Sequence, residues 1–190
     1  MAAQCSGKSN LLLNIGCGRL VRSGWVNIDY DPIDGESLYF DAIDTLPIEN
    51  GVVRHIHCEH FLEHLEYRDA VHFLRECYRV LADCGTMRII VPDAERYLRA
   101  YCAGDDEFFE RLIDLGGHVE PLRPKIRVCN QMFRMFGDHR FAWDFEALKM
   151  AASECGFSQI IRSSINEGDY AIDGQDWWRP FESLYANIHK

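Results

Sequence analysis

Short apolar runs alternate with amphipathic stretches along the first half of the chain. The first run, Leu11 to Ile15, is rich in Leu and Ile and stops at Gly16-Cys17-Gly18, so it predicts a buried parallel strand that ends in a tight turn. From Phe61 to Ala82 apolar residues recur at three- and four-residue steps, which predicts one helix. This helix is expected to end at Asp83-Cys84-Gly85, with Gly85 in a left-handed conformation. Further strands are expected at residues 25–28, 37–41, 52–58 and 86–91.

The second half begins with helical patterns that interrupt the alternation of strands and helices. Residues 94–102, 106–115 and 128–136 are expected to be helical, which makes residues 94–142 an insertion after the fifth strand. A last helix is expected from Phe145 to Cys155, with Asp144 as its N-terminal cap and Gly156 as its C-terminal cap. Strands are expected at residues 157–164 and 183–189, the last one antiparallel because only a loop precedes it.

This order of elements predicts an α/β fold with a doubly wound, mostly parallel seven-stranded sheet and an antiparallel last strand. Only Arg19 to Gly24 lie between the first turn and the second strand, so the first helix must be one turn or absent. No linker or change of composition marks a boundary, so residues 1–190 are expected to form a single domain. The insertion at 94–142 is then a lid, a binding pocket or a contact between subunits.

Residues with chemical function follow the predicted strands at the edge where parallel strands end. Gly16 and Gly18 follow the first strand, Asp29 the second and Asp41 the third, while Cys58, Glu59 and His60 close the fourth and Asp93 follows the fifth. A Gly-x-Gly turn lets the backbone come close to a ligand, and an acid at the tip of the neighbouring strand accepts hydrogen bonds from ribose hydroxyls. Because open parallel sheets bind ligands at this edge, the sequence predicts a nucleoside site there.

Charge and composition narrow the partners. The net charge of −10 opposes binding to nucleic acid, which requires Lys and Arg to neutralise phosphates. No apolar run approaches the roughly 20 residues of a membrane span, and the polar N-terminus lacks the apolar core of a signal peptide. None of the eight cysteines forms a Cys-x-x-Cys pair, which favours reduced thiols. We therefore expect a cytoplasmic protein without a membrane or nucleic-acid partner.

Several histidines near the fourth strand raise the question of a metal site. His55, His57, Cys58, His60 and His64 lie close together in sequence, but they do not follow the His-Glu-x-x-His order of zinc hydrolases. We expect no metal here. Histidines at such a corner between a strand and a helix more often hold it by hydrogen bonds, and His60 is also a candidate for a catalytic or substrate-binding role.

The ordered motifs together resemble a known family. Asn14-Ile15-Gly16-Cys17-Gly18, Asp29, Asp41 and Leu46-Pro47 are followed by the segments 59–65, 74–81 and 84–93. This string runs through nearly the whole chain and resembles the Rossmann-like methyltransferases that use S-adenosylmethionine, in particular their small type-11 members. The resemblance implies S-adenosyl-L-methionine as the cofactor and methyl transfer to an acceptor. The acidic charge favours a small-molecule or sugar-type acceptor over nucleic acid.

The resemblance also implies residue roles. Asp29 is similar to the acid that holds the cofactor ribose, Asp41 to the residue that meets the adenine amino group, and Glu59 is expected to contact the methionine part or to shape the pocket. The implied cofactor-binding set is Asn14, Gly16, Cys17, Gly18, Asp29, Tyr30, Asp41, Ala42, Cys58 and Glu59. An acceptor that must lose a proton needs a base, for which His60 is the first candidate and His118 and His139 the second.

Three departures from the family pattern support an alternative function. Asn14 replaces the acid usual at the end of the first strand, Leu20 and Val21 occupy the region of the third glycine, and Arg54 stands where the family often has Asp. A methyltransferase-fold protein with weak or no activity, acting as a binding module, is therefore the second hypothesis. A homodimer through the last strand or the insertion would suit it. A nicotinamide-dependent enzyme is disfavoured by the missing third glycine and the short first crossover.

Overall fold

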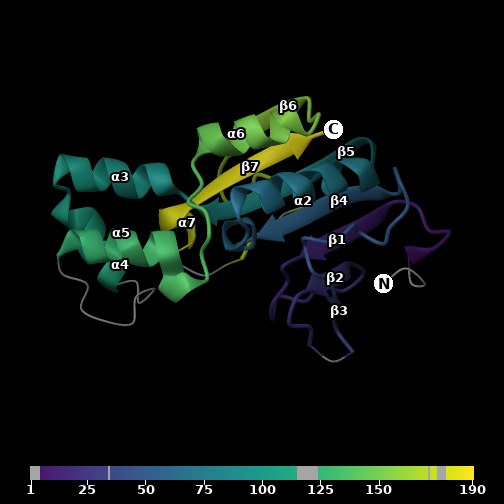
Figure 1. Ribbon diagram of the computed structural model, residues 1–190, viewed down its shortest axis with the longest axis horizontal. Coiled ribbons are helices and arrows are strands. Elements are labelled where there is room, and N and C mark those ends of the chain that lie inside the picture. Colours follow the sequence, from purple (N-terminus) through teal and green to yellow (C-terminus); the bar gives the residue numbers. More distant parts are fainter. Residues whose placement is uncertain (1–4, 34, 115–123, 171, 175–178) are drawn as a thin grey trace.

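The computed structural model describes residues 5–33, 35–114, 124–170, 172–174 and 179–190. Its centre is a seven-stranded sheet in the order β3-β2-β1-β4-β5-β7-β6, in which only β7 runs antiparallel to its neighbours (Figure 1). The predicted α/β architecture with an antiparallel last strand is confirmed. The strands are β1 (Leu11–Ile15), β2 (Val26–Asp29), β3 (Leu38–Tyr39), β4 (Val53–Glu59), β5 (Leu81–Pro92), β6 (Gln159–Ser163) and β7 (Ser183–His189).

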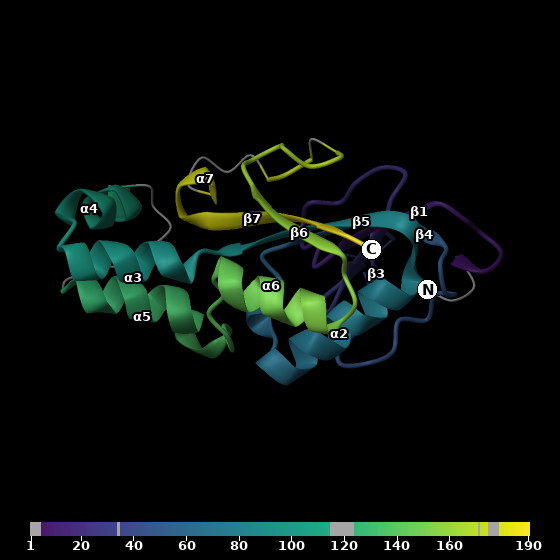
Figure 2. The same cartoon turned by 90° about the horizontal axis from the view of Figure 1, so that it is seen from above.

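Helices cover one face of the sheet and extend beyond one end of it. Figure 2 shows α2 and α6 side by side under one face, whereas α3, α4 and α5 lie beyond the edge at which the parallel strands end (Figure 1). Within the described ranges, no helix has both the length and the apolar character needed to cross a membrane. The helical segments are η1 (Leu62–His64), α2 (Tyr67–Val80), α3 (Ala94–Ala103), α4 (Asp106–Asp114), α5 (Lys125–Arg134), η2 (Met135–Gly137), α6 (Phe145–Glu154) and α7 (Arg179–Glu182).

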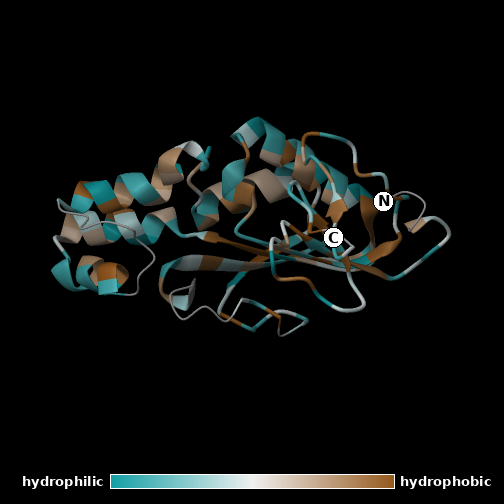
Figure 3. Ribbon diagram, turned by 90° about the horizontal axis from the view of Figure 1, so that it is seen from below, coloured by the Kyte–Doolittle hydropathy of each residue, from teal (hydrophilic) through white to brown (hydrophobic). Residues whose placement is uncertain are grey.

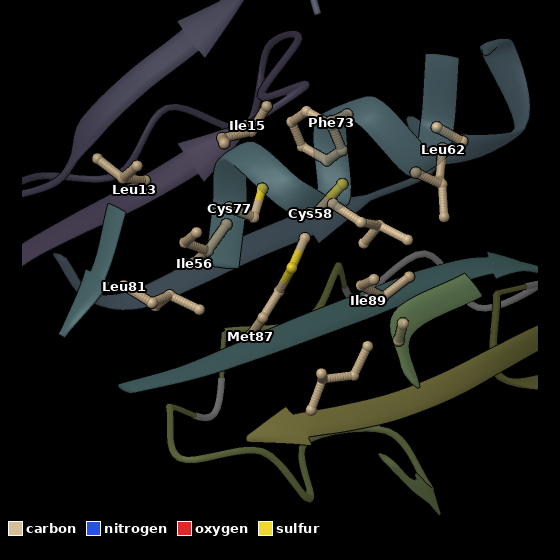
Figure 4. Packing of buried hydrophobic residues seen from close by; sticks show 14 of the residues in the cluster. Leu13, Ile15, Ile56, Cys58, Leu62, Phe73, Cys77, Leu81, Met87 and Ile89 are labelled. Atoms are coloured by element: carbon tan, nitrogen blue, oxygen red, sulfur yellow. The ribbon is translucent and has the colours of Figure 1, made fainter. Parts of the chain in front are cut away.

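The main hydrophobic core lies between the sheet and α2 and α6 (Figure 4). Because strand side chains alternate between faces, every second residue of the central strands points to this side. Leu13, Ile56 and Ile89 are examples, and each is 0% exposed. The insertion has a second hydrophobic cluster of its own, in which Tyr97 of α3 packs against residues of α4 and α5. Burial of the amphipathic faces therefore stabilises both parts.

The opposite face of the sheet is polar, although it too is covered. On β4 the side chains of His55, His57 and Glu59 point away from α2, and each is less than 7% exposed. On β5 the same face carries Arg88. Irregular loops, including the described part of residues 164–174, cover this side in place of helices (Figures 2 and 3). The two faces thus differ in what holds them: apolar packing on one and hydrogen bonds on the other.

The structure corrects two local predictions and decides a third that was left open. The helix expected over 61–82 is divided into η1 and α2, separated by Leu65 in an extended conformation. Cys84, and not Gly85, adopts the positive φ of 61°, because β5 begins already at Leu81 and a bulge occupies the following residues. Between β1 and β2 the described chain forms only turns, so the first helix is absent, as one of the two expected outcomes.

We expect His55 to make the stability depend on pH. Burial lowers the pKa of its imidazole to about 4, although the carboxylate of Asp169 opposes this shift. The unfolded chain takes up a proton on this residue near pH 6.5, whereas the folded chain does not until about pH 4. The free energy of unfolding should therefore fall by roughly 3 kcal/mol as the pH drops from about 6.5 towards 4.

Urea unfolding at several pH values measures this dependence. In His55→Asn the loss between pH 6.5 and pH 4.5 should be smaller than in the wild type, while His189→Asn, at the far end of β7, should keep it. Equal pH profiles of the wild type and His55→Asn would contradict the assignment.

Candidate functional site

The glycine turn after β1 is tied to the end of β2 by its backbone. The N–H groups of Gly16 and Cys17 donate to the carbonyl of Ile28 at 2.9 and 3.1 Å. Gly16 and Gly18 have φ values of 68° and 46°, which glycine adopts at little cost. A Cβ on Gly16 would lie 2.6 Å from Cβ of Phe61, so the space beside the turn is available only to glycine.

Asp29 lies against this turn. Its Oδ2 accepts a hydrogen bond from the backbone N–H of Gly18 at 2.7 Å, and its Oδ1 accepts one from Asp31 N at 2.9 Å. The structure therefore brings the glycine turn and the acid of the neighbouring strand into direct contact. Each carboxylate oxygen has lone pairs left for hydroxyl groups of a ligand, since a carboxylate oxygen accepts two hydrogen bonds.

A cavity of about 370 Å³ opens next to the turn at the end of β1. From β1 the chain continues to β2 on one side of the sheet, while β4 lies on the other side. This is the position at which strand order reverses, where open α/β sheets bind ligands. The lining residues are Asn14, Gly16, Cys17, Gly18, Arg19, Leu20, Arg22, Glu59 and His60. Five of the residues implied as cofactor-binding, and the first candidate base, thus share one cavity.

The sequence analysis missed Arg22, because it assigned no role to the short crossover. Two amides hold this segment: Nδ2 of Asn14 donates to Leu20 O at 2.8 Å and to Asn27 Oδ1 at 2.9 Å. Asn27 in turn accepts from Arg22 N at 2.9 Å and donates to Arg22 O at 3.0 Å. A buried Asn in two adjacent strands, at 2% and 7% exposure, is the signal that could have revealed a tethered crossover.

Glu59 and Arg22 form the charged wall of the cavity. The guanidinium of Arg22 lies 4.0 Å from Glu59 Oε2, and its Nε is buried without a hydrogen-bond acceptor among the described residues. Burial lowers the pKa of Arg22, and the nearby carboxylates of Glu59 and Asp173 oppose this shift. Glu59 also accepts hydrogen bonds from Gly174 N at 2.9 Å and contacts Nε2 of His57 at 3.0 Å. The residues 172–174 therefore close this wall.

His60 connects the cavity to a second one. Its Nε2 lies 3.1 Å from the hydroxyl of Ser183 and its Nδ1 3.2 Å from Oε1 of Glu63, while its backbone has a positive φ of 47°. Ser183 lines a cavity of about 550 Å³ that also includes Asp93, Arg96 and Arg162. His60 thus stands between two cavities on the same edge of the sheet.

Burial raises the pKa of Glu63, but the hydrogen bond and charge of His60 and the charge of His64 outweigh burial, so the pKa lies below its ordinary value. A Glu63 that stays ionised favours a proton on Nδ1 of His60. The Nε2 atom, beside Ser183, is then the basic one.

The remaining predicted cofactor residues are not among those that line the cavity. Asp41 accepts from Ile43 N at 3.2 Å, as a turn residue does, and Ala42 packs in the core at 4% exposure. Tyr30 is 64% exposed beside Tyr39. Cys58 points away from the cavity into the core under α2 (Figure 4), where burial raises its pKa well above the ordinary value.

Of the second candidate bases, His139 is not part of these cavities. His139 lies next to His64, with 5.0 Å between the ring centroids, and does not line either cavity. Burial lowers the pKa of His139, so its imidazole is neutral near pH 7. His118 lies outside the described residues.

Comparison with solved structures places this fold among known proteins. The chain is similar to a SAM-dependent methyltransferase from Archaeoglobus fulgidus, with 16% identity, a TM-score of 0.55 and coverage of 98% of this chain and 88% of the other. It is also similar to the N-methyltransferase NodS from Bradyrhizobium japonicum, solved with S-adenosyl-L-homocysteine, with 13% identity, a TM-score of 0.53 and coverage of 100% and 82%. A proposed O-methyltransferase from Nostoc punctiforme, at 13% identity and a TM-score of 0.55, covers 99% of this chain, which spans only 54% of its length.

No protein-family model and no curated protein matches the sequence, so the narrower resemblance to type-11 members stays a prediction. The structural similarity extends over the full chain, and the strand order with its antiparallel β7 is the one these enzymes have. The chain therefore has the Rossmann-like fold of S-adenosylmethionine-dependent methyltransferases.

Proposed function

We propose that this protein is an S-adenosylmethionine-dependent methyltransferase that acts on a small-molecule or sugar-type acceptor. The observation that supports it most is the contact between Gly18 and Asp29 beside the cavity at the switch point of the sheet. A nucleoside whose ribose hydroxyls bind Asp29 would lie next to the glycine turn, which lines this cavity. The similarity to methyltransferases, one of them holding S-adenosyl-L-homocysteine, supports the same cofactor.

The cavity offers partners for both ends of the cofactor. Asp29 would hold the ribose, and Asp41 and Ala42, which follow β3, would border the adenine. At the other end Arg22 has a buried Nε without an acceptor among the described residues, which suits the carboxylate of the methionine part. Glu59, in the same wall, suits the amino group and takes over part of the role that an acid at position 14 would have.

His60 is the residue that we assign to the acceptor. When bound, S-adenosylmethionine supplies an activated methyl group, so the protein needs only to position the acceptor and to exclude water. The cavity beyond Ser183 has the volume for a small acceptor, and Arg96 in its wall suits one with anionic or hydroxyl groups, while Arg162 there is paired with Asp93 and Glu95. For a hydroxyl acceptor, Nε2 of His60 would take the proton while Glu63 holds the opposite side of the ring.

The alternative, a binding module that no longer catalyses methyl transfer, is favoured by one observation. The Asn14 amide, at the position of the usual acid, is uncharged and holds the crossover through Leu20 O and Asn27 Oδ1. A thermal-shift assay distinguishes the two functions. A rise in Tm with S-adenosylmethionine supports the cofactor site, whereas no rise supports a module that binds a partner alone.

We expect Asp29→Ala to weaken binding of S-adenosylhomocysteine by at least about tenfold, because hydrogen bonds to a charged acceptor contribute about 1.5–3 kcal/mol each. Isothermal titration calorimetry measures the change. Asp31→Ala is a matched control, because Asp31 lies two residues after Asp29 and its side chain is exposed. This variant should bind like the wild type. An unchanged affinity in Asp29→Ala would remove Asp29 from the site.

Arg22→Gln should separate the two ends of the cofactor. Loss of the guanidinium should weaken S-adenosylhomocysteine about tenfold and leave adenosine almost unaffected, because adenosine has no carboxylate. Asp29→Ala should weaken both ligands, and Arg54→Gln, exposed on β4, neither. If Arg22→Gln weakens both ligands equally, Arg22 positions the loop and does not hold the carboxylate.

A further inference from the structure

A cluster of metal-ligating side chains lies outside both cavities. Glu63 and His64 belong to η1, directly after β4, and His139 follows η2 at the end of the insertion. One ligand atom of each lies within 4.8 Å of those of the other two. The rings of His64 and His139 meet edge to face, with 5.0 Å between their centroids. The fold therefore brings together three ligands from segments far apart in sequence.

Both histidines are oriented by backbone carbonyls. Nδ1 of His139 donates to the carbonyl of Met132 at 2.6 Å, and Nδ1 of His64 donates to that of Asp138 at 3.2 Å. A neutral imidazole that donates through Nδ1 keeps its lone pair on Nε2. Metal-binding histidines use this arrangement, in which the other ring N–H is fixed by a carbonyl or carboxylate. Binding through Nε2 would keep both hydrogen bonds.

Glu63 provides an independent observation. Its side chain is 2% exposed, and Oε2 is buried with no hydrogen-bond donor in the part of the chain that the structure describes. Among the described residues, Oε1 contacts Nδ1 of His60 at 3.2 Å. A buried carboxylate with so few donors costs considerable free energy, which a bound cation would offset. The acid is therefore placed where a positive ion stabilises it.

We propose that Glu63, His64 and His139 bind a zinc ion. Two imidazoles and one carboxylate are a ligand set that zinc uses, and they leave one coordination position open. Ligand atoms around tetrahedral zinc are about 3.4 Å apart, so the three side chains need to close by roughly an ångström. The ion would link the end of β4 to the end of the insertion, beside two backbone hydrogen bonds that Glu63 O accepts from Arg140 and Phe141.

This proposal departs from the expectation of no metal and does not rest on the proposed function. His139 comes from the far side of the insertion, so no local motif around His60 and His64 could include all three ligands. His60 stays outside the ligand set, since its Nε2 is engaged with Ser183.

The test uses the full, tag-free chain, stripped of metal with a chelator. Zn²⁺ titration by calorimetry should show about one site, and Zn²⁺ should raise the Tm. In His64→Gln and His139→Gln the affinity should fall at least tenfold and the rise in Tm should disappear, whereas His189→Gln should behave like the wild type. His64 is exposed, so His64→Gln should fold, which far-ultraviolet circular dichroism checks.

Co²⁺ substitution identifies the ligands directly. Nitrogen and oxygen ligands alone give visible d–d bands without a thiolate charge-transfer band, and these bands should be lost in His139→Gln. Two outcomes would overturn the proposal: unchanged Zn²⁺ affinity in both histidine variants, or a thiolate band, which would assign the ion to the exposed Cys84 or Cys102.

Discussion

A buried ion pair between Arg88 and Asp173 holds the loop after β6 on the polar face of the sheet. The two side chains are 1% and 0% exposed, and the guanidinium reaches both carboxylate oxygens. Its remaining donors bind Ser163 Oγ, Ser164 O and Asn187 Oδ1, so every N–H of Arg88 has an acceptor. A buried charge is tolerated when its partners are this complete, while loss of either partner would leave the other exposed to a large desolvation penalty.

The cavity beside the glycine turn depends on this pair through the residues next to Asp173. Gly174 N donates to Glu59, and the carbonyl of Ile172 accepts from the guanidinium of Arg22. The two charged residues of the cavity wall are thus positioned by a loop anchored several strands away. Most doubly wound sheets place helices on both faces, whereas here a hydrogen-bonded loop takes that place above β4 and β5 (Figure 2). Because a hydrogen-bonded loop covers this face in place of helices, the strand residues that point to it, including His55 and His57, are polar.

The sequence predicted the parts of the structure that depend on local pattern. Strand β1 with its glycine turn, the cap at Asp144 (whose side chain accepts from Ala147 N), and the antiparallel β7 each follow from neighbouring residues. The contact between Gly18 and Asp29 followed from the rule that parallel strands end at one edge. What could not be predicted depends on long-range pairing: Arg88 with Asp173, Arg22 with the loop, and His64 with His139. The division of the 61–82 helix also has a tertiary cause, because Glu63 O accepts from Arg140 N and Phe141 N of a distant segment.

The break between η1 and α2 determines where the side chains that follow β4 lie. Because the chain turns at η1 before α2 begins, His60 adopts a positive φ and reaches Ser183, while Leu62 turns into the core and Glu63 is buried beside both His60 and His139. An uninterrupted helix from Phe61 would fix these side chains by helical spacing and could not place His60, Leu62 and Glu63 in three different environments. The corner between β4 and α2 is therefore the point at which the carboxyl edge of the parallel strands, the hydrophobic core and the insertion meet. A non-glycine residue at positive φ is costly, and such strain is found mainly where the surrounding contacts and the function of a site require it.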